Sequence, residues 1–258
     1  MARAPESRSA IRVPATCTAA CREYLISLFK INGFLNFVLA MVTGIDSNAE
    51  TAHDALVKTA PSEEEREKLI QQWEDRVPMT DQLRRHRQFF LEIVLVRHIE
   101  NYLGYLSALL FEIFTQRPET LRSSEKVDVE HVLSHQSIDS LVRSIAERKV
   151  EELSYKSFGD LRAYFEDRFG LELCTEDAAP VIVEAMEIRN ISVHNRCIVN
   201  SRYIKRTSCD PALLGTTKHL YIDYLDTLVP LLSRLVISLD TAARKRLKLK
   251  GKRFTQPH

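Results

Sequence analysis

Apolar residues recur every three or four positions through the stretch LRRHRQFFLEIVLVRHIENYLGYLSALLFEIF, residues 83–114. Among them are Leu91, Val94, Leu95, Ile99 and Leu110. This spacing places their side chains along one face of a long α-helix. Only 7 of the 258 residues are glycine and 9 are proline, and strand-like alternation is scarce. The sequence therefore predicts an all-α protein, an antiparallel helical bundle with a helical N-terminal extension.

The chain divides by pattern into three parts. Residues 1–80 form the N-terminal extension, with 1–20 unstructured and helices at about 22–43 and 62–77, separated by an irregular segment at 44–61. Residues 81–250 form the helical domain, with further helices expected at 137–154, 158–169 and 175–195 and a last one kinked at Pro230. Residues 244–258 form a basic C-terminal tail.

The run from Tyr24 to Gly44 is long enough to span a bilayer. Lys30 lies near its middle, where a charge costs about 2.5–3.5 kcal/mol, so we expect a buried helix and no stable membrane insertion. The first 21 residues lack the apolar segment of a signal peptide, and the five cysteines are an odd number. Both features favour a cytoplasmic protein with reduced thiols.

Charge is unevenly distributed, although the net charge is +1. The segment RKRLKLKGKR, residues 244–253, holds seven basic residues, and nothing acidic follows Asp240. Such a tail could bind a phosphate backbone. The simpler interpretation, which we favour, is a solvated, frayed chain end.

The segment VIVEAMEIRNISVHNRCIVN, residues 181–200, carries the main candidate site. At helical spacing Glu187, Asn190 and His194 form one stripe, and Arg189 lies five residues before His194. Histidine can serve as acid or base near neutral pH, and arginine presents a charged fork to phosphate oxygens. These residue types suit RNA cleavage without a metal, with asparagine as the orienting group.

One chain supplies a single histidine of this kind, whereas the reaction needs both a base and an acid. A homodimer with a composite site would supply two. No cofactor and no metal site are expected. His131 and His135 lie four residues apart but lack a third ligand, and Cys17 and Cys21 lack partners at zinc spacing.

The segment EIRNISVHNRCIVNSRYIKRT, residues 187–207, closely resembles the signature helix of the HEPN superfamily, whose motif is arginine, often followed by asparagine, then four to six residues to histidine. LVRHIENYLGYLSALLFEIF, residues 95–114, resembles the long first helix of such domains. The resemblance covers about residues 85–245. It implies an all-α bundle that dimerises along the motif helices. In active members it implies a metal-independent endoribonuclease of toxin, abortive-infection or RNA-processing type, and a toxin would have an antitoxin or regulatory partner.

By motif position, Arg189, Asn190 and His194 would be the catalytic group. One departure is that relatives often have glycine after the His-Asn pair, where this chain has Arg196 and Cys197. The departure concerns the shape of the loop and not the helix.

Plainer interpretations stay open. The spacing alone also occurs at Arg253 and His258, and a lone helical histidine is usually structural. The same residues could belong to a non-catalytic module that binds nucleotide, RNA or a protein. Glu187 could support His194 or form an ion pair, and Asn195 could contact substrate or cap the helix; the second role is favoured for both. Weaker candidates are His98, Glu100, Asn101 and the basic cluster at residues 83–88.

Overall fold

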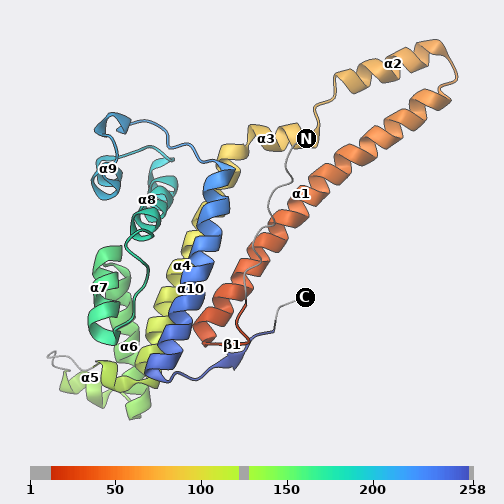
Figure 1. Ribbon diagram of the computed structural model, residues 1–258. Coiled ribbons are helices and arrows are strands. Elements are labelled where there is room, and N and C mark those ends of the chain that lie inside the picture. Colours follow the sequence, from red (N-terminus) through yellow and green to blue (C-terminus); the bar gives the residue numbers. More distant parts are fainter. Residues whose placement is uncertain (1–12, 122–127, 256–258) are drawn as a thin grey trace.

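The computed structural model describes residues 13–121 and 128–255 and is built almost entirely of helices (Figure 1). The helices are α1 (Ala19–Thr59), α2 (Glu63–Glu74), α3 (Met79–Arg85), α4 (Arg87–Gln116), α5 (Val129–Leu133), α6 (Ile138–Ser154), α7 (Phe158–Phe169), α8 (Ala179–Asn195), α9 (Ser201–Thr207) and α10 (Ile222–Leu247). Short 3₁₀ turns cover Pro118–Leu121 and Pro211–Leu213, and strands β1 (Thr16–Cys17) and β2 (Lys252–Arg253) pair antiparallel. The predicted all-α helical bundle is confirmed.

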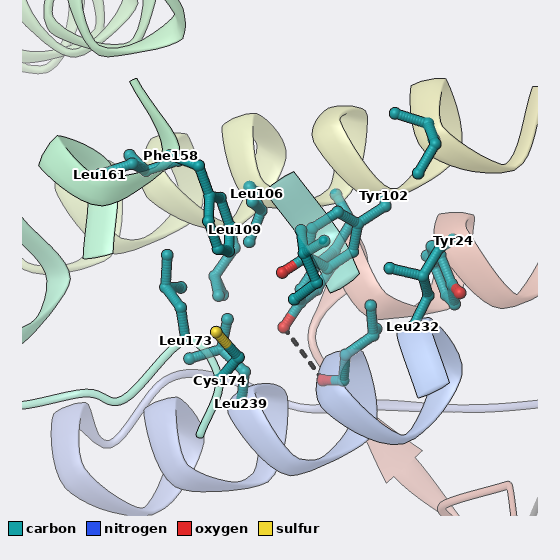
Figure 2. Packing of buried hydrophobic residues seen from close by; sticks show 14 of the residues in the cluster. Tyr24, Tyr102, Leu106, Leu109, Phe158, Leu161, Leu173, Cys174, Leu232 and Leu239 are labelled. Atoms are coloured by element: carbon teal, nitrogen blue, oxygen red, sulfur yellow. Dashed lines mark hydrogen bonds between the residues drawn. The ribbon is translucent and has the colours of Figure 1, made fainter. Parts of the chain in front are cut away.

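Helix α4 is the centre of the bundle and packs against α1, α6, α8 and α10. Its apolar face is almost completely buried, as the spacing of its apolar residues predicts. Figure 2 shows Leu106 and Leu109 of α4 packed with Phe158, Leu173 and Leu239 from other parts of the chain. The Tyr105 hydroxyl donates to a backbone carbonyl of α10 at 3.2 Å. The core therefore joins the elements that surround the motif helix.

Helix α1 is one continuous helix of 41 residues. The expectation that residues 44–61 are irregular is wrong. No proline occurs between Pro14 and Pro61, and the cost of Gly44 in a helix, about 1 kcal/mol, is too small to break it. Tyr24, Leu25 and Leu28 lie in the common core, so the packed part of the molecule does not begin at residue 81.

The C-terminal part of α1 leaves the bundle and forms, with α2, a projecting arm (Figure 1). The expected burial of the Tyr24–Gly44 run is wrong for this part, because Phe34 and Phe37 are more than 60% exposed. By length and composition alone α1 could cross a membrane, with a mean hydropathy of 1.8 over an 18-residue window that is 17% buried. Core helices and signal sequences pass the same test.

Local sequence signals set most of the other boundaries. Ser137 and Ser157 begin α6 and α7 with capping boxes, and Gly170 ends α7 in the left-handed conformation at φ 59°. The long central helix begins later than expected, because the chain breaks at His86 and residues 79–85 form the separate helix α3.

The ends of the described chain lie together. Thr16 pairs with Arg253 in the two-stranded sheet, and the Phe254 amide donates to the Ala15 carbonyl at 3.1 Å. Arg244 also donates to the Thr16 carbonyl at 2.6 Å. The expectation of a frayed basic tail is therefore wrong through residue 255, and so is the unstructured assignment for residues 16–20. Residues 1–12 and 256–258 of these two segments lie outside the described residues.

Candidate functional site

The motif helix α8 ends at Asn195 as predicted but begins at Ala179 rather than at residue 175, with Pro180 in its first turn. Ile182, Ala185, Ile188 and Ile191 are buried and fix the helix against α4 and its neighbours. This packing leaves the polar residues of the motif at the edges of the buried face, so their positions follow from the core.

The turn that ends α8 has an uncommon backbone. Arg196 and Cys197 both have positive φ, 51° and 61°, although neither is glycine. The Cys197 amide donates to the Ile191 carbonyl, and the Asn195 side chain donates to the Ile198 carbonyl at 2.7 Å. Asn195 therefore holds the turn together, and Arg196 is the capping position. The loop takes the left-handed geometry that glycine favours without having glycine there.

Arg189 is held between two polar partners. Its Nε donates to the Glu100 carboxylate of α4 at 2.6 Å, with a second close contact from Nη2, and its Nη1 donates to the Asn190 side-chain oxygen at 3.0 Å. The Arg189 side chain is 26% exposed, so the pair faces solvent. Of the weaker candidates, Glu100 is thus brought to the motif.

His194 is exposed near the C-terminal end of α8. Within the described residues it makes no hydrogen bond or ion pair with Arg189, Asn190 or Glu100. One helical turn separates it from Asn190, so the two side chains lie along the same edge of α8. A single protomer therefore brings Arg189, Asn190 and Glu100 together but leaves His194 free to meet another group.

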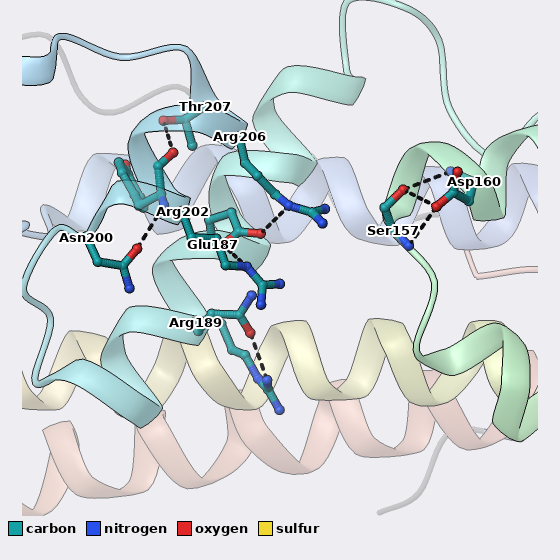
Figure 3. Close-up of polar contacts among 10 residues, drawn as sticks. Ser157, Asp160, Glu187, Arg189, Asn200, Arg202, Arg206 and Thr207 are labelled. Carbon is teal, nitrogen blue, oxygen red and sulfur yellow. Dashed lines mark hydrogen bonds and ion pairs between the residues drawn. The ribbon is translucent and has the colours of Figure 1, made fainter.

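Glu187 forms ion pairs, as the sequence favoured. It is only 3% exposed, and the Nε atoms of Arg202 and Arg206 approach its carboxylate at 3.3 and 3.6 Å. Figure 3 shows both arginines reaching it from α9. Its Oε2 accepts no hydrogen bond of good geometry, although Arg202 Nε lies 3.3 Å away, so the arginines neutralise this buried carboxylate through charge.

The remaining weaker candidates have structural roles. His98 is buried, and burial lowers the pKa of its imidazole to about 4. Asn101 donates to the Tyr24 carbonyl at 3.0 Å and so ties α4 to α1. In the basic cluster at residues 83–88, Arg84 pairs with Asp81, which fits the local salt-bridge interpretation.

An open pocket of about 680 Å³ adjoins the motif, between α8, α9 and the start of α7. Its lining residues are Tyr155, Lys156, Ser157, Phe158, Gly159, Val183, Met186, Glu187, Asn190, Arg202, Lys205 and Arg206. Four of these are cationic and one, Glu187, is acidic. Sequence reasoning missed the four cations; the helical spacing of Arg202 and Arg206 in SRYIKRT was the signal that could have identified two of them.

Over residues 13–121 and 128–255, no group of three or more histidine, cysteine, aspartate or glutamate side chains could hold a metal ion. The rings of His131 and His135 lie 4.7 Å apart, but His135 Nδ1 contacts the His131 carbonyl instead of a shared ligand. As far as residue 255, the basic tail lies away from the motif helix, beside β1.

No protein-family model matches the sequence, and the searches of curated proteins and of solved structures found no match. The geometry around α8, together with the sequence of that helix, is therefore the basis for a functional assignment.

Proposed function

We propose that this protein is a metal-independent endoribonuclease of HEPN type that acts as a homodimer. The observation that carries the proposal is the arrangement on α8. An exposed imidazole, His194, lies one turn from Asn190, which in turn binds the guanidinium of Arg189. Asn190 also lines an open pocket that carries four cationic side chains.

The chemistry requires one base, one acid and positive charge at the phosphate. The base removes the proton from the ribose 2′-hydroxyl, whose oxygen then attacks phosphorus. The bond from phosphorus to the 5′-oxygen breaks, and the acid gives that oxygen a proton, leaving a 2′,3′-cyclic phosphate and a 5′-hydroxyl. In the proposed dimer one His194 is the base and the partner's His194 is the acid, while Arg189 stabilises the phosphate charge.

Exposed apolar side chains beside the motif support dimer formation. Ile93 lies seven residues before Glu100 on α4, and Val193 lies four residues after Arg189 on α8, so both lie near the Arg189–Glu100 contact. Ile93, Val193 and Phe89 are each half or more exposed. Burying such a patch against a second copy would stabilise a twofold dimer that brings two motif helices together.

A second candidate function is a non-catalytic module that binds nucleotide, RNA or a protein. The observation that favours it is the Arg189–Glu100 ion pair, because a guanidinium already neutralised by a carboxylate is less available to a phosphate. In that case the motif residues would hold a ligand or a partner without cleaving it.

The test is to incubate the purified protein with mixed cellular RNA in EDTA and to analyse the new ends. We expect cleavage that leaves 2′,3′-cyclic phosphates and 5′-hydroxyls, and its loss in His194→Ala. His219→Ala is the matched control, because His219 is also exposed but lies outside the motif. Absence of cleavage by a folded dimer would favour the binding module, and equal cleavage by wild type and His194→Ala would refute the assignment of the motif.

A further inference from the structure

The pocket beside the motif has the composition of a site for a nucleotide rather than for an apolar ligand. Lys156, Arg202, Lys205 and Arg206 supply four positive charges, and Glu187 is the one carboxylate that lines it. The cavity volume of about 680 Å³ is within the range of about 300–1,000 Å³ that is usual for ligand pockets. The excess of positive charge favours an anionic ligand.

The pocket also offers surfaces for a base. Tyr155 lines the pocket, and 83% of its surface is exposed, so its aromatic ring is accessible to a ligand. Phe158, Val183 and Met186 supply apolar lining. An exposed ring beside cationic side chains is the combination that binds single-stranded nucleic acid, by stacking and by phosphate contact.

Glu187 holds two of the cations at the pocket wall. Its buried carboxylate pairs with the Nε atoms of Arg202 and Arg206 at 3.3 and 3.6 Å. The side chains of these two arginines are 61% and 40% exposed, so their remaining N–H groups can donate to a phosphate in the pocket.

Asn190 links the pocket to the motif. It lines the pocket and accepts a hydrogen bond from Arg189, so a nucleotide in the pocket would lie next to the phosphate-binding guanidinium. The geometry points to the pocket as the subsite that holds one nucleotide of a single-stranded RNA adjacent to the cleaved bond. The identity of the ligand rests on the proposed function; the ligand chemistry, a phosphate attached to a stacking base, rests on the pocket.

The test measures binding without cleavage. The probe is a fluorescein-labelled, single-stranded 2′-O-methyl RNA, which has no free 2′-hydroxyl and is followed by fluorescence anisotropy over a range of salt concentrations. The first variant is the double substitution Lys156→Gln and Lys205→Gln, which leaves the Glu187 ion pairs intact. The matched control is Arg66→Gln with Lys68→Gln on α2, which removes the same charge from the exposed arm.

We expect the pocket variant to bind more weakly and to lower the slope of log Kd against log salt by about 1.4, since each phosphate contact on a single strand contributes about 0.7. The α2 control should keep the wild-type slope. Tyr155→Ala should weaken binding about 5- to 150-fold through lost stacking, and Tyr155→Phe should retain it. If the pocket and α2 variants behave alike, the pocket does not bind RNA.

A competition arm distinguishes the two sources of a nucleotide. If a single nucleoside monophosphate displaces the oligonucleotide completely and binds as tightly, the ligand is a free nucleotide and the RNA subsite is wrong. The two proposals also fail separately. Loss of binding in the pocket variants without any cleavage by wild type would refute the nuclease and keep the pocket. Normal binding and normal cleavage by the pocket variants would refute the pocket as the RNA subsite and keep the nuclease.

Discussion

Two consecutive residues at the end of α8 adopt a backbone conformation that L-residues avoid. Arg196 and Cys197 have φ of 51° and 61°, and the Arg196 side chain is exposed, so nothing in the core fixes its identity. The left-handed conformation costs a residue with a Cβ about 1–2 kcal/mol. Glycine removes that cost but adds about 0.5–1 kcal/mol of unfolded-state entropy.

Arg196→Gly should therefore raise the free energy of unfolding by about 0.5–1 kcal/mol. Urea unfolding followed by circular dichroism measures the change. Arg196→Ala is the control, because it removes the same charged side chain but keeps the Cβ, and it should bring no comparable gain. A gain of equal size in both variants would show that charge rather than backbone strain is responsible.

His98 makes stability depend on pH. Burial lowers its pKa from 6.5 to about 4. Between these two values the unfolded chain binds a proton at this imidazole and the folded chain does not, so lowering the pH favours unfolding. The contribution of His98 is fully present above pH 6.5 and is lost as the pH falls toward 4, at no more than about 1.4 kcal/mol per pH unit.

We expect His98→Gln to flatten the dependence of unfolding free energy on pH between about 6.5 and 4, because the amide does not titrate. Urea midpoints measured at several pH values for both proteins give the difference. The comparison of slopes, rather than of absolute stability, isolates the imidazole, because Gln can also cost packing. Parallel curves would contradict the assignment of the low pKa.

At the scale of elements, the contact between α4 and α8 controls the charge available at the motif. The Arg189–Glu100 pair is partly exposed on both sides, so its contribution to stability is small, about 0–1 kcal/mol. Its effect on ligand binding should be larger, because Glu100 competes with a phosphate for the same guanidinium.

Glu100→Gln should therefore leave the unfolding midpoint almost unchanged and tighten binding of the 2′-O-methyl RNA. Anisotropy titration at fixed salt measures this effect. Glu92→Gln is a suitable control, since Glu92 lies on the same helix but does not contact Arg189 in the described structure. If Glu100→Gln weakens binding, Glu100 positions Arg189 for the phosphate instead of competing with it.

Elements with local signals are the ones that the sequence predicts correctly. Capping serines set the starts of α6 and α7, and Gly170 sets the end of α7. The predictions that are wrong concern segments whose structure no local sequence signal determines. Residues 44–61 are helical because α1 continues through Gly44, and the basic tail is ordered because a distant strand, β1, pairs with it.

The features of the candidate site also separate into those that the local sequence predicts and those that depend on tertiary packing. The position of Arg189, Asn190 and His194 on one helix follows from spacing alone, and the ion pair of Glu187 was the favoured interpretation. The pocket could not be predicted, because Lys156 and Arg202 come from segments that meet only through tertiary packing. The same holds for Glu100, which pairs with a residue 89 positions away.

At the scale of the whole molecule, exposed apolar side chains of the described residues gather in several places, among them the arm of α1 and α2, the region of α5, and the patch with Phe89, Ile93 and Val193 beside the motif. This patch lies on α4 and α8, the helices that carry the Arg189–Glu100 contact. We therefore expect the dimer contact there, where a twofold axis would bring two His194 side chains together.

Sedimentation equilibrium should give twice the mass of one chain for wild type and a monomer for Ile93→Asp, with RNA cleavage lost in the same variant. Phe37→Asp on the arm is the control for an added charge at an exposed apolar position, and it should remain a dimer. A monomer for Phe37→Asp and a dimer for Ile93→Asp would move the interface to the arm.

The hydrogen bonds between Thr18 and Asp240 bear on the order of synthesis. Thr18 caps the start of α1, and its backbone and side chain both donate to a carboxylate 222 residues later. At about 5–20 residues per second, a ribosome needs about 11–44 s to make that interval. Helix α1 can pack on α4 much earlier, once residue 116 has been made. The Thr18 cap nevertheless lacks its carboxylate partner until nearly the whole chain exists, so the first turn of the first helix is among the last parts of the fold to be completed.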